Sequence, residues 1–154
     1  MNAPIKSQIK SANTTPSAGI KLLGLEIGLV LAGGFAGALV RVGVSLLILP
    51  FDHGFPWDIL FINISGSFLL GALAGYRDIN SRKHELLWLT VGVGFIGAYT
   101  TFSSYALGVV NLALAGKASL SALYLAGSML AGILTVEAGL FFGAQFLKKA
   151  AAVK

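Results

Sequence analysis

Cysteine is absent from this 154-residue chain, and histidine and charged residues are scarce. Without cysteine there can be no disulfide, no thiolate metal ligand and no cysteine nucleophile. The two histidines, His53 and His84, both fall in predicted loops, which argues against a zinc or haem site. Charged residues make up 11% of the chain, against roughly 25% in an average soluble domain. Such a chain is too apolar for an ordinary globular surface, so a lipid bilayer is the expected environment.

Four long apolar segments fill most of the chain and are separated by short polar connections. They cover residues 22–49, 58–76, 86–114 and 120–147. Each can span the hydrocarbon core of a bilayer, which requires about 20 helical residues. The expected fold class is an all-α integral membrane protein with four transmembrane helices in residues 22–147, a disordered tail at 1–21 and a basic tail at 148–154.

The first apolar segment also has features of a secretory signal peptide. Lysines precede it, and Ala36-Gly37-Ala38 has the small-residue pattern of a cleavage site. Hydrophobic residues nevertheless continue to Leu49, so an uncleaved transmembrane span explains the whole segment better.

Positive charges gather on one side of the predicted bundle. Four spans place both termini and the 77–85 loop on this side, which carries Lys6, Lys10, Lys21, Arg77, Arg82, Lys83, Lys148, Lys149 and Lys154. The opposite side carries Lys117. The positive-inside rule therefore predicts that both termini are cytoplasmic. No basic, aromatic-interleaved patch indicates nucleic acid.

The run from Gly97 to Tyr105 interrupts the third apolar segment with a glycine and a series of hydroxyl groups. A bilayer core offers no water to unpaired backbone groups, so a break at membrane depth persists only where it lines a cavity or is buried in protein. We therefore predict that the third helix is broken here and that the break belongs to a functional site. Freed carbonyls and the negative end of the half-helix favour a small cation near Gly97 and Thr100.

Glycines and one asparagine indicate close contacts in the first two spans. Gly33 and Gly37, and likewise Gly71 and Gly75, follow the four-residue spacing that lets helices approach closely in lipid, and packing alone accounts for most of these glycines. Asn63 lies in the first third of the second span. Its amide offers two donors that lipid cannot satisfy, so it either bridges helices or faces a pore, and considered alone the bridge is the more common role.

The fourth span carries a stripe of hydroxyl groups. Ser121, Tyr124, Ser128 and Thr135 follow spacings of three, four and seven residues, which place them on one helix face. One interpretation is a polar track for an ion. The alternative is that the Ser and Thr hydroxyls bond back to their own helix and that Tyr124 is an interfacial anchor.

The break and the stripe share a chemistry that is rich in hydrogen-bond donors and nearly free of charge. Hydroxyls and an amide can donate to a small hard anion, and the electropositive ring edges of Phe102 and Tyr105 can add to this. An ion passes such a lining only if binding replaces its hydration yet still permits release, and neutral donors meet this compromise better than fixed cations.

The ordered motifs of the four spans resemble those of the Fluc (CrcB) fluoride channels. The resemblance covers about residues 22–147 and rests on the set taken together, because any one motif is weak. The matching residues are Gly33-Gly34-Phe35-Ala36-Gly37-Ala38 with Arg41, Asn63-Ile64-Ser65-Gly66-Ser67-Phe68 with Gly71, Gly94-Phe95-Ile96-Gly97, and Thr100-Thr101-Phe102-Ser103.

The resemblance implies a passive fluoride channel of prokaryotic inner membranes that exports toxic fluoride, built as an antiparallel, dual-topology dimer with two pores. It implies that the fluoride pore is lined by Asn63, Thr101, Phe102, Ser103, Tyr105, Tyr124 and Ser128. Arg41 corresponds to an arginine near the aqueous vestibule. The backbone carbonyls of Gly97 and Thr100 correspond to positions that hold a structural sodium ion at the dimer interface. Tyr105 stands where phenylalanine is usual and adds a hydroxyl.

Two assemblies are compatible with the sequence. An antiparallel homodimer should have balanced loop charge, whereas the loops of this chain are strongly one-sided. The partner is therefore either a second copy, half of whose molecules insert against their charge bias, or a homologous subunit of opposite orientation. Arg41 and Glu137 lie at similar depth if the neighbour is inverted, so they could form a pair between subunits. Alternatively, Glu137 faces an aqueous vestibule alone.

Other functional classes fit less well. A small proton-coupled multidrug exporter also has four short spans, but it needs a carboxylate in its substrate chamber, and Glu26 lies only near the beginning of the first span. A purely structural membrane subunit leaves the polar track unexplained. Enzymatic activity has little support, because no nucleophile, base and orienting acid are grouped in the sequence.

Overall fold

The computed structural model describes residues 16–48, 54–77 and 81–152. The regular elements in these ranges are all helical. They are α1 (Pro16–Leu47), α2 (Trp57–Tyr76), α3 (Arg82–Leu87), the π-helical stretch η3 (Trp88–Ile96), α4 (Gly97–Tyr99), α5 (Phe102–Leu114) and α6 (Ala118–Ala152). Four stretches are long and apolar enough to cross a membrane: Leu22–Leu47, Trp57–Tyr76, Arg82–Leu114 and Ala118–Lys149. The predicted four-span, all-α membrane fold is confirmed, and so is the broken third helix.

Both predicted tails are partly helical. α1 begins at Pro16, so the last six residues of the segment predicted to be disordered continue the first helix. Proline is well suited to the first position of a helix, because its missing N–H would have no intrahelical partner there. At the other end, alanine-rich residues extend α6 to Ala152. Residues 1–15, Pro50 and His53 lie outside the described residues.

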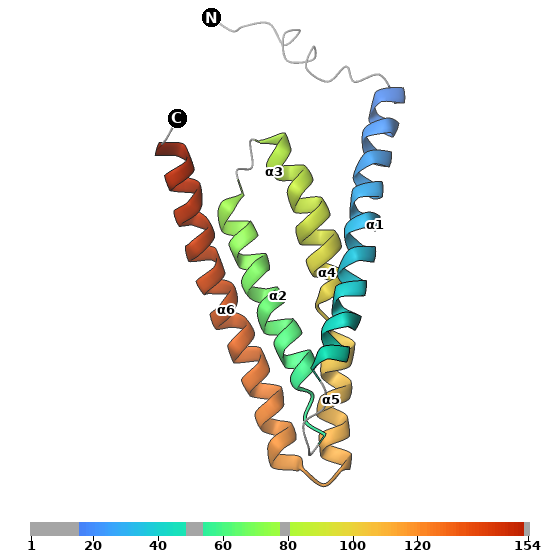
Figure 1. Ribbon diagram of the computed structural model, residues 1–154, viewed down its shortest axis with the longest axis vertical. Helices are drawn as coiled ribbons and strands as arrows, with labels where there is room; N and C mark the ends of the chain where they lie inside the picture. Colours follow the sequence, from blue (N-terminus) through green and yellow to red (C-terminus); the bar gives the residue numbers. More distant parts are fainter. Residues whose placement is uncertain (1–15, 49–53, 78–80, 153–154) are drawn as a thin grey trace, which may run out of the picture.

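Successive spans run in opposite directions (Figure 1). The beginning of α1, the end of α2, the beginning of α3 and the end of α6 lie at one end of the bundle, which we call the basic end. α2 lies between α6 and the third span, and α1 packs on the other side of the third span. The break between α4 and α5 therefore lies between α1 and α2, well inside the bundle's length.

Glycines bring α2 and α6 into backbone contact along a seam formed by Gly71, Gly75, Gly139 and Gly143. A Cβ atom built on Gly71 would overlap the carbonyl oxygen of Val136, and one built on Gly143 would overlap that of Ala72. Gly75 and Gly139 are equally tight against backbone atoms of the facing helix. The packing role predicted for Gly71 and Gly75 is confirmed, and Gly139 and Gly143 share it, because only residues without side chains permit this approach.

A second glycine contact joins α1 to η3. A Cβ atom on Gly33 would overlap the carbonyl oxygen of Thr90, and one on Gly37 would overlap that of Phe95. Facing them, Gly94 of η3 lies against the carbonyl oxygen of Val30. This contact fixes the first half of the third span against α1 and so positions the break that follows it.

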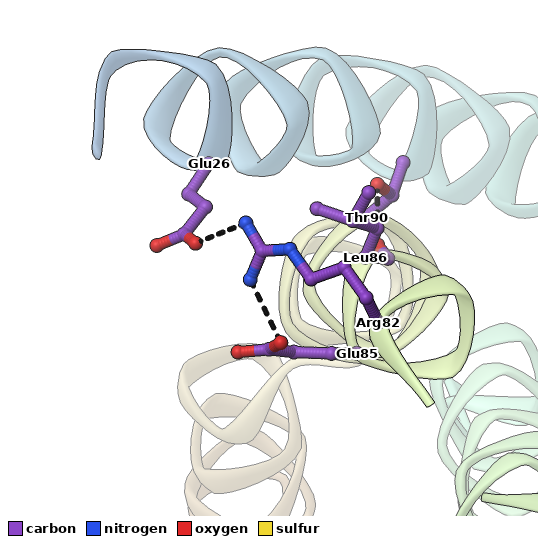
Figure 2. A network of polar contacts seen from close by, with 5 residues as sticks. All are labelled: Glu26, Arg82, Glu85, Leu86 and Thr90. Atoms are coloured by element: carbon purple, nitrogen blue, oxygen red, sulfur yellow. Dashed lines mark hydrogen bonds and ion pairs between the residues drawn. The ribbon is translucent and has the colours of Figure 1, made fainter. Parts of the chain in front are cut away.

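An arginine joins α1 to α3 at the basic end (Figure 2). The guanidinium of Arg82 donates to the Glu26 carboxylate at 2.7 Å and to the Glu85 carboxylate at 2.7 Å. All three side chains are partly exposed, so water weakens both ion pairs. Glu26 is thus engaged in an ion pair at the rim of the bundle, far from any enclosed chamber of the kind that an exporter would need.

Candidate functional site

The third span changes direction at Thr100 and Thr101, where the backbone is extended. Thr100 has φ −77° and ψ 158°, and Thr101 has φ −150° and ψ 122°. Gly66 of α2 makes room for this turn, because a Cβ atom there would overlap the methyl group of Thr100. The junction, as we call these two residues, therefore lies directly against α2.

Asn63 satisfies the backbone of the junction. Its Nδ2 donates to the carbonyl oxygen of Thr101 at 3.0 Å, and its Oδ1 accepts from the N–H of Thr101 at 2.9 Å. One side chain on α2 thus replaces the helical bond that the Thr101 N–H has lost and gives the Thr101 carbonyl oxygen a further donor. The bridging role expected for Asn63 is present, and the second N–H of the amide is left for another acceptor.

The hydroxyl of Thr101 caps the following helix. Its Oγ1 accepts from the N–H of Ser104 at 3.3 Å, as the N-cap residue of α5. The same oxygen lies 3.2 Å from the hydroxyls of Ser103 and Ser104. Thr101 is buried whereas Ser103 is exposed, so the cluster connects the interior of the junction to its open side.

The junction leaves two carbonyl oxygens without their helical partners. In an uninterrupted helix Thr101 N–H would donate to Gly97 and Ser104 N–H to Thr100. Both N–H groups donate to side-chain oxygens instead, of Asn63 and of Thr101. Neither N–H group therefore donates to the carbonyl oxygens of Gly97 and Thr100, where the sequence predicts a small cation. Within the described ranges, no three His, Asp or Glu side chains gather where they could hold a metal ion.

Two adjoining hollows follow α2 past the junction. The first has a volume of about 260 Å³ and is lined by Asn63, Gly66, Ser67, Leu70, Thr100, Thr101, Phe102 and Tyr105. The second, of about 390 Å³, shares Asn63, Ser67, Leu70, Phe102 and Tyr105 and adds Ser128, Met129, Gly132, Ile133 and Val136 of α6. We call the pair the polar hollow. Its lining includes no charged side chain, and it brings together predicted site residues from α2, α5 and α6.

The two aromatic residues of α5 are placed differently. Phe102 is 79% exposed, whereas Tyr105 is 7% exposed, and their ring centroids lie 5.7 Å apart. The Tyr105 hydroxyl donates to the carbonyl oxygen of Leu125 in α6 at 2.7 Å. This bond turns the hydroxyl toward the α6 backbone, so the ring of Tyr105 remains as a wall of the polar hollow.

The hydroxyl stripe of α6 separates into two kinds of residue. Ser121 donates to the carbonyl oxygen of Val109 at 2.7 Å, and Thr135 donates back to Ala131 at 2.8 Å, so these two hydroxyls are satisfied by backbone. The hydroxyls of Tyr124 and Ser128 are buried and have no hydrogen-bond partner. Ser128 lines the polar hollow, whereas Tyr124 packs against Tyr105, with ring centroids 5.4 Å apart, and lines neither part of the hollow. A buried hydroxyl without a partner is costly, so each is a candidate donor to a ligand.

Arg41 and Glu137 lie apart from the polar hollow and from each other. Arg41 lines a hollow of about 310 Å³ together with Ser45, Ile59, Thr101 and Ser103, among others, so it is connected to the exposed side of the junction. Glu137 is exposed on α6. It precedes Gly139 by two residues, which turns it away from the seam. Neither forms an ion pair with another described residue.

Sequence reasoning missed some contributors to the site. Ser45 stands one helical turn after Arg41, a spacing that could have indicated a shared face. Ser65 and Tyr99 share a hydrogen bond of 3.0 Å beside the junction. No local pattern reveals that bond, because its partners are 34 residues apart in the chain.

Comparisons with known proteins match this chain over the same region. A family model described as "CrcB-like protein, Camphor Resistance (CrcB)" matches residues 28–140. A "Fluoride-specific ion channel FluC" of Chlorobium phaeobacteroides (strain BS1) is 42% identical over 121 residues, 78% of this chain and 91% of the relative. Another, of Agrobacterium fabrum (strain C58), is 41% identical over 123 residues, 77% of this chain and 96% of the relative. "Fluoride-specific ion channel FluC 1" of Brucella abortus biovar 1 (strain 9-941) is 40% identical over 119 residues, 75% of this chain and 43% of the relative.

Proposed function

The chain belongs to the CrcB family, and on this premise we propose that it is a fluoride-specific ion channel that exports fluoride passively and so reduces fluoride toxicity. The family consists of channels, so the protein is not an enzyme, and family membership does not support the proton-coupled exporter. The ion pair of Glu26 with Arg82 agrees with this, because it removes the carboxylate that an exporter would use.

The single observation that carries the mechanism is the pair of unpartnered hydroxyls on α6, that of Ser128 in the lining of the polar hollow and that of Tyr124 beside the ring of Tyr105. Fluoride is small and strongly hydrated, so a pore must offer donors that replace its water without holding it permanently. The free N–H of Asn63, the Ser128 hydroxyl, and the ring edges of Phe102 and Tyr105 provide such donors in a lining that includes no charged side chain. The Tyr124 hydroxyl adds a donor beside the ring of Tyr105. Thr101 and Ser103 provide further hydroxyl donors between the polar hollow and the hollow lined by Arg41. The positive charge of Arg41 attracts anions to this entrance.

We propose that the pore is completed by a second, inverted subunit. The polar hollow is open at Phe102, which is 79% exposed, and Gly97 and Ser103 are exposed beside it. One chain therefore supplies only one wall. The partner is a second copy of this chain or a homologous subunit of opposite orientation. Expression of the chain alone, followed by fluoride efflux from vesicles, decides between them, because a chain that needs a different partner gives no efflux.

The inverted arrangement also pairs Arg41 of one subunit with Glu137 of the other. Both charges lie inside the span and have no ion-pair partner among the described residues, and an unpaired charge is costly in a membrane. Because the chain has no cysteine, Arg41→Cys and Glu137→Cys can be joined by a short bismaleimide without background. Covalent dimers should form with this pair and not with Arg41→Cys and Gln145→Cys, whose α6 position lies about 12 Å further along the helix.

A structural sodium ion fits the freed carbonyls of Gly97 and Thr100, which we propose as its ligands in the dimer. Sodium would supply a fixed positive charge that holds two extended junctions together, and the chain's own contribution is the pair of carbonyls that Asn63 and Thr101 free from helical bonding. The protein is a multi-pass membrane protein, and we propose the inner membrane of a prokaryotic cell as its location. The basic end is cytoplasmic in the subunit that follows its charge bias, and the partner has the opposite orientation.

The experiment that tests the proposed function measures fluoride and chloride efflux from proteoliposomes. The parent should release fluoride far faster than chloride. Asn63→Asp keeps an acceptor for the Thr101 N–H but puts an anion beside the path and removes a donor, so fluoride efflux should fall on the order of 100-fold. Asn111→Asp, the same change at an exposed position of α5, is the matched control and should leave efflux unchanged. Equal efflux of the two halides from the parent would reject the assignment.

A further inference from the structure

A second pair of hollows lies along α6 toward the basic end, the first between α2 and α6 and the second on α6 alone. One has a volume of about 450 Å³ and is lined by Phe68, Ala72, Tyr76, Phe142, Gly143 and Phe146. The other has about 440 Å³ and is lined by Phe141, Phe142, Gln145, Phe146 and Lys149. They adjoin at Phe142 and Phe146, which line both, and we call the pair the aromatic groove.

The aromatic groove is separate from the polar hollow. Successive helical residues are about 100° apart, so Phe142, Phe146 and Lys149 project from one flank of the α6 face that carries Gly139 and Gly143. Met129 and Ile133, which line the polar hollow, project from the other flank. No lining residue is common to the two features. The aromatic groove therefore has no part in the proposed ion path.

The length of the aromatic groove along the helix axis is close to the thickness of one leaflet of a bilayer. From Phe68 to Tyr76 it follows α2 for about 12 Å at 1.5 Å per residue, against roughly 15 Å for half of the hydrocarbon core. Its wall is made of rings and methyl groups over this length. At the level where the spans end, the lining includes the charged residue Lys149, whose side chain is exposed in the last turns of α6.

The charges around the aromatic groove indicate what kind of molecule occupies it. Lys149 forms no ion pair with another described residue, and no acidic side chain lines either part of the aromatic groove. An occupant must therefore combine an apolar chain with an anionic group at its outer end. A protein partner would have to bring an acidic residue to this one level, whereas an anionic phospholipid has its phosphate at this level throughout the leaflet.

We propose that the aromatic groove is a binding site for an anionic phospholipid, with one acyl chain between Phe68 and Phe146 and the phosphate on the ammonium group of Lys149. The bound lipid covers the flank of the α2–α6 seam that the polar hollow does not occupy. This site depends on the membrane-spanning fold and is independent of selectivity for fluoride.

The test uses the full chain with Phe146→Trp as a reporter, reconstituted in phosphatidylcholine vesicles. Phosphatidylglycerol or phosphatidylcholine with brominated chains is added in increasing amounts, and the fluorescence of the parent, which contains Trp57 and Trp88, is subtracted. Quenching of the reporter should reach half its limit at about a fivefold lower fraction of phosphatidylglycerol than of phosphatidylcholine, as expected for one lysine near a phosphate.

Two neighbouring lysines provide the matched controls. With Lys149→Gln the preference for phosphatidylglycerol should disappear, whereas Lys148→Gln, one residue away on a different face, should keep it. Soluble glycerol phosphate should not relieve the quenching, because the acyl chain carries most of the contact. Equal behaviour of the two lysine variants, or relief of quenching by glycerol phosphate, would overturn the proposal. If the reporter variant does not fold, the same comparison is made through thermal stabilisation of the parent by phosphatidylglycerol, which Lys149→Gln alone should abolish.

Discussion

The α2–α6 seam and the junction at Thr100 and Thr101 both bring backbone against a neighbouring helix inside the membrane, yet they do so by opposite means. At the seam, glycines allow carbonyls of one helix to touch the backbone of the other, and every residue keeps its helical geometry. At the junction the helix is open, and the side chains of Asn63 and Thr101 replace the missing helical bonds.

The seam and the junction should therefore be sensitive to different kinds of substitution. The seam is limited by volume, because even one methyl group meets backbone that cannot move aside. The junction is close-packed against Gly66 on one side but borders the polar hollow on the other, and it depends on hydrogen bonds that lipid cannot replace. Changes of volume should therefore damage the seam, and isosteric changes of polarity should damage the junction.

The largest effect is expected for Gly143→Ala in the seam. The new Cβ atom would overlap the carbonyl oxygen of Ala72, so the helices must separate, and overpacking of this kind costs about 1–3 kcal/mol. The control is Gly127→Ala on the same helix, where no atom lies within 4 Å and where alanine is the better helix former. Thermal unfolding in detergent should show a large loss for the first variant and no loss for the second. Equal stability of both would mean that the seam is not limited by volume.

Thr101→Val tests the junction at constant volume. Valine keeps the shape of threonine but cannot accept from Ser104 N–H, and the loss of such an N-cap costs typically about 1 kcal/mol. Because the same hydroxyl organises Ser103 and Ser104, fluoride efflux should fall as well. Thr101→Ser retains the oxygen and should restore both stability and efflux. Normal efflux in Thr101→Val would show that the cap is structural only.

The sequence was sufficient to predict the four spans and the broken third helix, because both follow from hydrophobic length and from polar residues where lipid excludes water. It also indicated the glycine contacts through their four-residue spacing. The ends of the helices were harder, since residues 16–21 and 148–152 lie beyond the apolar run, and hydrophobic length does not indicate how far a helix continues past it.

Single hydroxyls of the candidate site could not be assigned from spacing. Ser121, Tyr124, Ser128 and Thr135 have the same periodicity, yet only Tyr124 and Ser128 lack a partner. Which hydroxyl is satisfied depends on the carbonyls that the tertiary fold brings near it. For Ser121 this is a carbonyl of α5, which the sequence of α6 alone cannot reveal.

Tyr105→Phe and Tyr124→Phe sharpen the comparison by removing one hydroxyl each from neighbouring rings. The Tyr105 hydroxyl bonds to Leu125, so its loss should cost about 1 kcal/mol of stability while efflux stays within about twofold of the parent, since the ring edge remains. The Tyr124 hydroxyl is buried without a partner, so its loss should raise stability slightly and reduce efflux. Thermal unfolding and efflux measured on both variants check that stability falls in Tyr105→Phe and efflux falls in Tyr124→Phe. The reverse result would place the ion donor at Tyr105.

The smallest effect is expected for Arg82→Gln, which removes the ion pairs to Glu26 and Glu85 at the basic end. These side chains lie outside both the seam and the junction, and they are partly exposed to water that already screens them. Stability at physiological ionic strength should match that of the Lys83→Gln control, which removes the same charge from an adjacent exposed residue. A small difference should emerge only at low salt. Efflux should be unchanged, and a loss of efflux that persists at high salt would instead mean that α1 must be held to α3 for the junction to keep its geometry.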